Sequence, residues 1–451
     1  MNTPQTRVIT TGLMLFALFF GAGNLIFPPV IGAQSGPSLL AAVTGFLLTG
    51  VLLPAAGVVA VASSGQGITG LAHRLGVGFG IGFPTAVYLA IGPCYAIPRV
   101  ATVSYELATR PLLAAAGVVD PRWGLVVHSL VFFAVSVALA FNPSRIADRV
   151  GRWLTPALLA LILLLCTLVF IGQQPVHRDA SDAFAAHAFA AGITRGYFTM
   201  DALASIVFGI VVIDALRGQV ASGSRPLLRA AMAAGLLAAA LLGLVYAGLA
   251  VVGTRVPGDP ADGAGLLLTA ARRSLGGAGL TVFAAIVLLA CLTTAIGLLN
   301  ACASYAVSLV PRPSWQGWLL VGAGISLLLA NLGLEMILFI VGPLTMLLYP
   351  MAIALIVVTL LNVMVPGHLR ATYFGAVGVA GLLGAVAAAA ELGFATLSSW
   401  LAWLPSWDSG MGWLLPAMLG LVIGLAIDAI SGRLRADSTR SDAVVNSSDP
   451  A

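Results

Sequence analysis

The stretch that decides the fold is Phe16–Pro29, FALFFGAGNLIFPP, which lies in the first long apolar run of the chain. Backbone inside a bilayer has no water to satisfy its free polar groups, so an unbroken helix is expected there. Yet two glycines and Asn24 stand at the middle of this run, and a proline pair follows. Glycine is permissive and proline lacks a backbone donor, so the helix is predicted to open near Gly21–Asn24.

An interrupted helix at membrane depth has two explanations. In secondary transporters, a broken helix whose backbone lines a cavity is where substrate and ion bind. Alternatively, small residues notch a helix so that its neighbours can pack closely. The side chain of Asn24 favours a binding site, because close packing does not need a polar amide at this position.

The composition indicates a polytopic membrane protein. Hydrophobic residues make up 60% of the chain and charged residues only 8%, and the mean hydropathy is +1.04, which excludes a soluble domain. The net charge of +5 does not indicate nucleic-acid binding, because its arginines are scattered among short loops. Four cysteines fall inside apolar runs and are predicted to be packing residues rather than disulfide or metal ligands: Cys94, Cys166, Cys291 and Cys302.

Apolar runs predict an all-α fold with about twelve spans, each long enough for a hydrocarbon core of roughly 30 Å. Both termini are predicted to be cytoplasmic, because this orientation puts thirteen arginines inside and seven outside. Segments 173–194 and 254–275 then become outer loops. The predicted spans are 8–32, 38–62, 78–108, 123–141, 152–172, 195–216, 227–253, 276–310, 315–331, 335–364, 371–397 and 412–431.

The order of the spans predicts two inverted repeats. Residues 1–172 hold five spans and residues 195–366 hold five more, and an odd number inverts the second set, as in many sodium-coupled carriers. Two additional spans follow in 370–432, and the polar tail 433–451 is predicted to be a disordered cytoplasmic segment. The repeat predicts a break in the sixth span, where polar and small residues interrupt Asp201–Gly209, although a packing face also explains them.

Thr293 and Thr294 form the second polar feature, within ACLTTAIGLLN of the eighth span. A small alkali cation needs several oxygen ligands, which threonine hydroxyls and freed carbonyls supply. Membrane threonines also commonly bond back to their own helix and do nothing else. The broken first helix favours the cation site.

Six charged side chains fall inside the predicted spans and must face protein or water, because lipid makes them costly. Arg99 and Glu106 lie two turns apart on one helix face, which suits a gate or a structural ion pair. Asp201 could attract a substrate ammonium, help hold a cation or cap the second half-helix, and proton coupling through a carboxylate is open. Asp214 is predicted to be an end charge, solvated or paired with Arg217. The other two are Glu335 and Glu391.

Two other functional classes fit poorly. A channel needs a continuous polar stripe or a filter repeated by symmetry, and two unlike halves with few charges argue against it. An enzyme needs a nucleophile with a base, or a metal cluster. His128 is the one histidine inside a predicted span, and no such motif accompanies it, so the chain is predicted not to be an enzyme.

Five motifs of this chain resemble the bacterial branched-chain amino acid:cation symporters, and the resemblance runs from Arg7 to Leu434. It implies the fold of the sodium-coupled leucine transporters, and import of leucine, isoleucine and valine across the bacterial cytoplasmic membrane, usually with sodium. The motifs are FALFFGAGNLIFPP, GPCYAIPRVATVSYE (Gly92–Glu106), LTPALLALILL from Leu154, TMDALASIVFGIVVIDALR (Thr199–Arg217) and ACLTTAIGLLNACASY (Ala290–Tyr305).

The resemblance also implies a substrate site. The backbone amides of Ala22, Gly23 and Asn24 would meet the substrate carboxylate, helped by the positive end of the second half-helix. Tyr95 would lie near that carboxylate, with Tyr88 as the alternative. The side-chain pocket would be lined by Leu203, Ala204, Ser205 and Phe208.

Sodium is the coupling ion that the resemblance implies, with no other cofactor. Asn24 matches a ligand of a second sodium site, whose other ligands have no counterpart in this sequence. Leucine, isoleucine and valine should compete for a neutral pocket that excludes lysine and glutamate; proton-coupled transport of other neutral amino acids is the alternative. The implied ligands of the first sodium are the carbonyls of Ala17, Phe20 and Ala290 and the hydroxyls of Thr293 and Thr294.

Overall fold

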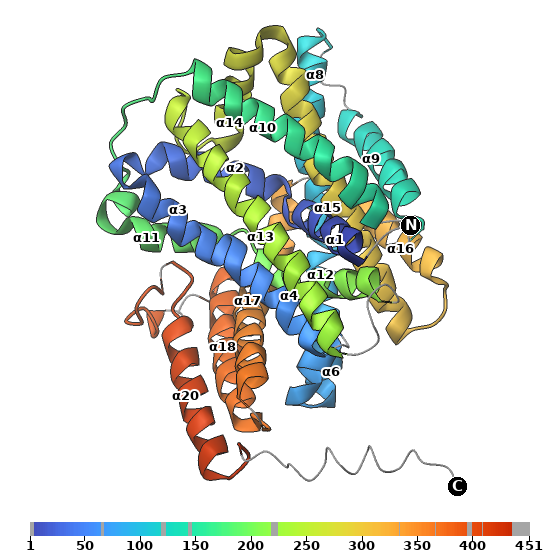
Figure 1. The fold of residues 1–451 in the computed structure, drawn as a ribbon, viewed down its shortest axis with the longest axis vertical. Coiled ribbons are helices and arrows are strands. Elements are labelled where there is room, and N and C mark those ends of the chain that lie inside the picture. The colour runs from blue at the N-terminus through green and yellow to red at the C-terminus, as the bar shows by residue number, and fades with distance from the viewer. Residues whose placement is uncertain are drawn as a thin grey trace. The chain divides into compact units, whose positions relative to one another are not determined.

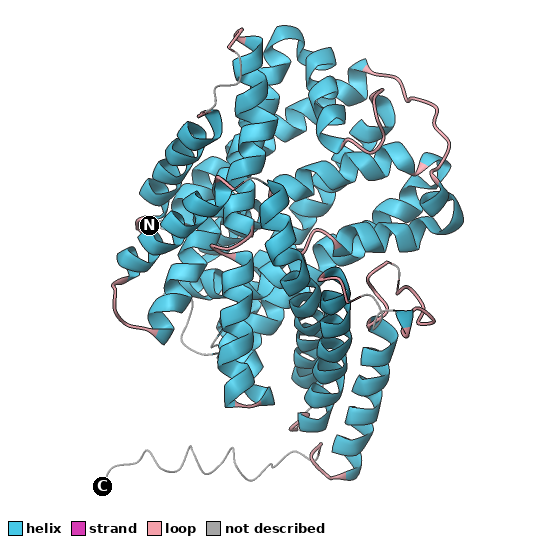
Figure 2. Ribbon diagram, turned by 180° about the vertical axis from the view of Figure 1, so that it is seen from behind, coloured by secondary structure: helices cyan, strands magenta, loops and turns pink. Residues whose placement is uncertain are grey.

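The described part of the chain is helical throughout. Its helices are joined by turns and loops, and no β-strand occurs among these residues (Figure 2). The chain divides into two compact units, Met1–Ile68 with Thr85–Leu344 and Thr69–Pro84 with Thr345–Ala451. The computed structural model describes residues 4–64, 67–118, 123–142, 147–217, 224–332, 334–365, 367–394, 399–407 and 409–434, so nearly all of the tail predicted to be disordered lies outside the described residues.

Within these residues, seven helical segments are long and apolar enough to cross a membrane. Two bent helix pairs pass the same test as single spans, and three shorter apolar helices add to them. The all-helical, polytopic prediction is therefore confirmed, whereas the number of spans stays a prediction.

The first five predicted spans are more interrupted than the sequence indicated. Span three, predicted as one helix over 78–108, breaks at Gly92–Tyr95, and π-helical turns interrupt spans two and three at Leu48–Leu52 and Tyr105–Thr109. The helices of this part are α1 (Pro4–Phe19), α2 (Ala22–Gln34), α3 (Leu39–Leu47), α4 (Leu53–Ser64), α5 (Gly67–Ala72), α6 (Val77–Ile91), α7 (Ala96–Ser104), α8 (Arg110–Ala115), α9 (Gly124–Ala140) and α10 (Thr155–Gly172), with a π-helical segment before α10 at Ala147–Leu154.

The structure corrects the predicted position of the break in the sixth span. The segment 173–194, predicted to be an outer loop, contains most of α11 (Asp182–Tyr197), which meets α12 (Asp201–Leu216) at a 45° bend. The break therefore precedes Asp201 instead of falling within Asp201–Gly209. Within α12, Gly209 packs against Val61 of α4, so the packing explanation holds for this glycine.

The second predicted outer loop is also partly helical, since α14 (Gly263–Leu275) occupies it. The remaining predicted spans agree with the helices to within a few residues, except that α18 stops six residues earlier than predicted, at Glu391. These helices are α13 (Ser224–Arg255), α15 (Gly279–Leu309), α16 (Trp315–Ala330), α17 (Leu334–Met364), α18 (Arg370–Glu391) and α20 (Leu414–Ile430).

Glycines join the two halves of the chain. A Cβ at Gly32 of α2 would collide with the Ala250 carbonyl oxygen of α13, and one at Gly253 would collide with the Pro29 carbonyl oxygen. The same arrangement joins α3 to α11, where a Cβ at Gly192 would collide with the Ala42 carbonyl oxygen (Figure 1). Absent side chains let these backbones approach closely, so each broken span packs on a helix of the opposite half.

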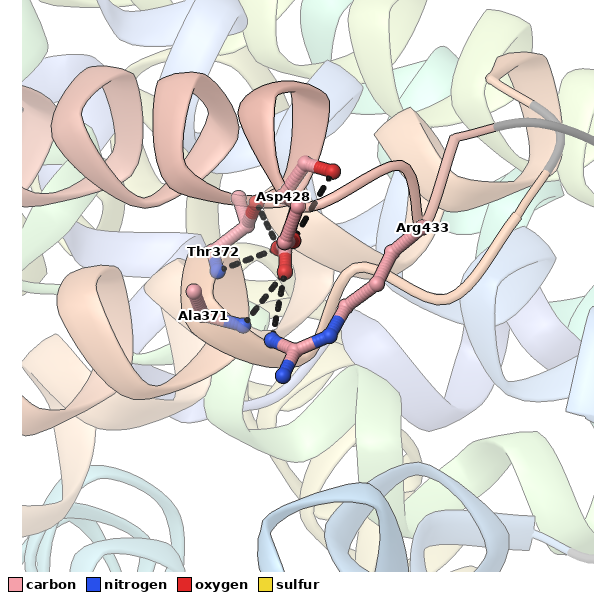
Figure 3. A network of polar contacts seen from close by, with 5 residues as sticks. Ala371, Thr372, Asp428 and Arg433 are labelled. Atoms are coloured by element: carbon pink, nitrogen blue, oxygen red, sulfur yellow. Dashed lines mark hydrogen bonds and ion pairs between the residues drawn. The ribbon is translucent and has the colours of Figure 1, made fainter.

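In the second unit, a buried carboxylate ties α20 to the first turn of α18 (Figure 3). Asp428 is fully buried and accepts hydrogen bonds from the backbone amides of Ala371 and Thr372 and from the Thr372 hydroxyl. Arg433 lies 3.2 Å from the same carboxylate. The carboxylate thus satisfies amides that a helix start leaves free.

Candidate functional site

The first break separates α1 from α2 at Phe20 and Gly21. Gly21 is extended, with φ −93° and ψ −175°, and the flanking segments Gln5–Phe19 and Gly23–Gln34 meet at 70°. The opening is shorter than predicted, because Gly23 and Asn24 already belong to the first turn of α2. Among the described residues, no side chain caps this helix start.

Neither glycine of the break has a left-handed backbone conformation. Gly21 is instead a place of close approach, since a Cβ there would lie 3.3 Å from the Thr294 hydroxyl, whereas a Cβ at Gly23 would make an ordinary contact at 3.5 Å with a guanidinium nitrogen of Arg99. The glycines therefore provide space beside polar groups. The sequence alone could not distinguish this role from a backbone conformation that only glycine adopts readily.

The second break contains a residue in an unusual conformation. Met200, which precedes α12, has φ 61° and ψ 17°, in the left-handed region that side chains rarely adopt. Such backbone occurs where surrounding structure holds it, often at binding sites. Here it directs the first turn of α12, which begins with Asp201, toward the first break.

Asn24 and Asp201 connect the two breaks. The Asn24 side-chain amide donates to the Asp201 carboxylate at 2.7 Å and to the Phe19 carbonyl oxygen at 2.5 Å. Both side chains are buried, at 3% and 5% exposure. Asp201 is the first residue of α12 and bonds across to α2, so a polar contact unites the two half-helices.

The two threonines of α15 face the end of α1. Thr293 donates to the carbonyl oxygens of Ala17 and Ala290, both at 3.0 Å, and Thr294 donates to Leu18 at 3.2 Å. Five hydroxyl and carbonyl oxygens thus gather beside the first break. Hard cations prefer oxygen ligands, so this group of oxygens fits a hard cation. Of the residues implied as ligands, Phe20 alone contributes no oxygen to these hydrogen bonds.

A cavity of about 80 Å³ lies between these elements. Five of the residues that the resemblance implies for the substrate site line this cavity, namely Gly23, Asn24, Tyr95, Ala204 and Phe208. The other lining residues are Leu18, Phe19, Gly21, Phe27, Ile91, Ala96, Arg99, Val100, Thr199, Met200, Asp201, Thr294 and Leu298.

Three residues implied for the substrate site lie elsewhere. Leu203 and Ser205 are fully buried outside the lining, because the helical period turns Asp201, Ala204 and Phe208 toward the cavity. Tyr88, the alternative to Tyr95, stacks on Tyr305 with ring centroids 4.1 Å apart and lines a different cavity. Ala22 begins α2, and its backbone lies beside the lining residue Gly23.

The profile of a family described as branched-chain amino acid transport protein matches residues 4–431. The chain belongs to this family. Members similar to it include the branched-chain amino acid permease BrnQ of Corynebacterium glutamicum, 41% identical, with 94% of this chain and 96% of the relative covered. The branched-chain amino acid permease BraB of Bacillus subtilis is 38% identical, with 96% and 97% covered.

Solved structures identify the fold of this branched-chain amino acid transport family member. A nucleobase-cation-symport-1 family transporter, closed with bromovinylhydantoin bound, superposes with a TM-score of 0.59 at 16% identity, covering 96% of this chain and 94% of that one. MhsT in complex with L-phenylalanine gives 0.54 at 16% identity, covering 92% and 97%. The leucine-transporter-like fold expected from the sequence is confirmed.

Three other charged residues of the predicted spans are exposed. Glu106 is a member of an ion pair, but its partner at 2.8 Å is Arg110 and not Arg99, and Glu106 is exposed. Asp214 lies 3.9 Å from Arg217 with both side chains about half exposed, as predicted for an end charge. Glu391 is exposed at the end of α18, and the side chain of Glu335 lies outside the described residues.

Arg99 is the cavity residue whose role sequence reasoning missed. Its guanidinium donates to the Tyr95 hydroxyl at 2.7 Å and lies over that ring. The signal was present, because residues four apart lie on one helix face and Tyr95 was already placed at the site.

Proposed function

We propose that this chain imports leucine, isoleucine and valine together with sodium across the bacterial cytoplasmic membrane by alternating access. The observation that carries the proposal is the group of hydroxyl and carbonyl oxygens formed by Thr293, Ala17 and Ala290 beside the first break. Family membership supports the substrate class, since the relatives are branched-chain amino acid permeases.

Sodium coupling follows from the position of these oxygens. A cation held between α1 and α15 would tie the end of α1 to a helix of the opposite half, and Thr294 would add a second hydroxyl. Binding sodium would therefore favour one arrangement of the broken helices. A ligand shifts a conformational equilibrium only by its differential affinity, and this bridging position supplies one.

The substrate would bind between the two breaks. Its carboxylate would meet the uncapped start of α2, where free amides and the helix dipole favour an anion. Its aliphatic side chain would fill the cavity against Phe19, Ala204 and Phe208. Alternating access would then require the half-helices α1 and α12 to move against their surroundings. Both termini would be cytoplasmic, and the exposed apolar helix faces would contact lipid.

A proton-coupled carrier of neutral amino acids is the second candidate, and Asp201 favours it. This carboxylate is 5% exposed at the break, and a buried carboxylate at such a position can carry a proton instead of a charge. In the sodium-coupled carrier the threonines would bind the coupling ion, whereas in the proton-coupled carrier Asp201 would bind it.

Liposomes containing the purified chain test the proposal. An inward sodium gradient without a pH gradient should drive labelled leucine uptake, and a pH gradient without sodium should not. One sodium moving down 100 mV gains about 2.3 kcal/mol, which supports roughly 40-fold accumulation. Uptake driven by the pH gradient alone would select the second candidate. Labelled leucine that fails to exchange against unlabelled leucine would contradict both.

A further inference from the structure

The cavity between the breaks carries one positive and one negative side chain. Arg99 comes from α7 and Asp201 from α12, and the other described lining residues are uncharged. Arg99 bonds to the Tyr95 hydroxyl, and Asp201 bonds to the Asn24 amide. Neither charge forms an ion pair within 4 Å with another described residue. Two opposite charges thus face one cavity, each held by a neutral neighbour.

Both charges stand against the first turn of α2. A guanidinium nitrogen of Arg99 lies 3.5 Å from the Cβ position of Gly23, so the cation stands against the first turn of α2. Asp201 lies at the start of α12, on the side of the cavity where Asn24 reaches across. The apolar residues Phe19, Phe208 and Leu298 complete the lining.

The geometry points to a paired receptor for a zwitterion, in which Arg99 holds the α-carboxylate and Asp201 holds the α-ammonium. This assignment rests on the proposed transport function and adds two charged side chains to the backbone amides of α2. Asn24 and Thr199 both bond to Asp201, and an ionised carboxylate, with about four acceptor sites, has sites left for an ammonium. The planar guanidinium suits a carboxylate, which it can meet with two parallel hydrogen bonds.

The receptor should reject any ligand that lacks one head group. A ligand with an ammonium alone leaves Arg99 without a charged partner in a desolvated site, although its hydrogen bond to Tyr95 remains. A ligand with a carboxylate alone leaves Asp201 without a charged partner in the same way, although its hydrogen bond to Asn24 remains. Two leucine analogues separate these cases: 3-methylbutylamine lacks the carboxylate, and 4-methylpentanoate lacks the ammonium. Losing one partner of a buried charge pair weakens binding by about 30-fold or more, so wild-type protein should bind leucine at least that much tighter than either analogue.

The test measures leucine binding to the purified full chain at saturating sodium, with each analogue as competitor. Arg99→Gln should lose about 30-fold in leucine affinity, and its preference for leucine over 3-methylbutylamine should fall by a similar factor, while its preference over 4-methylpentanoate should be kept. Asp201→Asn should show the reverse pattern. A role limited to folding would weaken all three ligands together.

Matched controls remove charges of the same kind outside the cavity. Arg110→Gln and Asp214→Asn alter exposed residues, the latter in the same helix as Asp201, and both should keep wild-type preferences. If Arg99→Gln does not fold, Arg99→Lys should bind leucine weakly and still discriminate against the amine. If wild-type protein bound leucine and 3-methylbutylamine with equal affinity, the assignment of Arg99 and Asp201 would fail and the proposed function would stand. If wild-type protein bound no branched-chain amino acid, both the assignment and the proposed function would fail.

Discussion

The hydroxyl of Thr294 donates a hydrogen bond to the carbonyl oxygen of Leu18 over 3.2 Å, although 276 residues separate them in the chain. This contact joins α15 to the last turn of α1, immediately before the first break. Thr293 makes a parallel contact to Ala17 one residue earlier. Both hydroxyls therefore face a neighbouring helix end, where a cation between the helices would take oxygens from each side.

Removing these hydroxyls should weaken the response to sodium. We expect Thr293→Val and Thr294→Val to reduce the sodium dependence of leucine binding far more than they change leucine affinity at saturating sodium, because valine keeps the shape without the hydroxyl. By linkage, sodium should tighten leucine binding in the wild type and lose that effect in the variants. Leucine binding measured across a sodium titration checks both expectations.

The control for the threonine variants is Thr44→Val. Thr44 is exposed on α3 and bonds back to the Leu40 carbonyl at 2.9 Å, the local contact common to membrane threonines. It should keep the wild-type sodium response. An unchanged response in both α15 variants would mean that the cation binds elsewhere or is a proton.

Enlarging Gly23 should abolish transport and spare the fold. The Cβ of alanine would fit at 3.5 Å from the Arg99 guanidinium, but the branches of valine would reach into the cavity. Gly23→Val should therefore lose leucine binding while inserting and migrating on size exclusion like the wild type. Gly243→Val, at a position with open space in α13, is the matched control. Normal leucine affinity in Gly23→Val would contradict the site.

Gly253 should matter to stability instead of binding. Alanine there would collide with the Pro29 carbonyl oxygen, and overpacking against backbone typically costs about 1–3 kcal/mol. Gly253→Ala should lower the unfolding temperature in detergent. Gly243→Ala, ten residues earlier in the same helix, has no heavy atom within 4 Å and should be neutral or slightly stabilising. Equal unfolding temperatures for the two variants would show that α2 and α13 tolerate separation.

Asp428→Asn should weaken the second unit. The carboxylate accepts hydrogen bonds from two amides and a hydroxyl, and an asparagine amide would turn a donor toward some of these donors. A buried group left unsatisfied costs about 1–3 kcal/mol, so faster proteolysis of the α18–α20 region is expected. Asp214→Asn, at an exposed site, should be cleaved at the wild-type rate. Leucine affinity should be unchanged in both variants.

Competition among substrates should reflect the charge of the cavity, in which one positive and one negative side chain give no net charge. Excess isoleucine or valine should suppress labelled leucine uptake, because a hydrophobic pocket separates ligands by only about 1–3 kcal/mol per methylene. Arginine and aspartate should not compete, since each leaves an extra charge without a partner. Strong inhibition by arginine would show that the cavity carries a further negative group.

The sequence predicted the first break because glycines and Asn24 interrupt a long apolar run, a pattern that only an opened membrane helix or tight packing explains. It misplaced the second break, because α11 is as long as α12 but less apolar, so its sequence resembles a loop, and the contact of its glycines with α3 is a tertiary feature. The break before α7 and the contact between Asn24 and Asp201 depend on which helices meet, and residues 177 positions apart give no local signal of contact. Helical period alone could have separated Ala204 and Phe208 from Leu203 and Ser205.

The glycine contacts between α2 and α13 and between α3 and α11 bear on biosynthesis. Neither half of the chain can cover its own glycine faces, because the matching surface is synthesised about 150–220 residues later or earlier, roughly 10 s apart or more at typical elongation rates. Until the partner helices are synthesised, the glycine faces of the nascent amino-terminal helices would therefore contact lipid or the insertion machinery. A chain severed between Gly172 of α10 and Asp182 of α11 separates both pairs of helices, and it should accumulate only when both pieces are made together. Pulse-chase decay of each piece expressed alone would reveal that dependence.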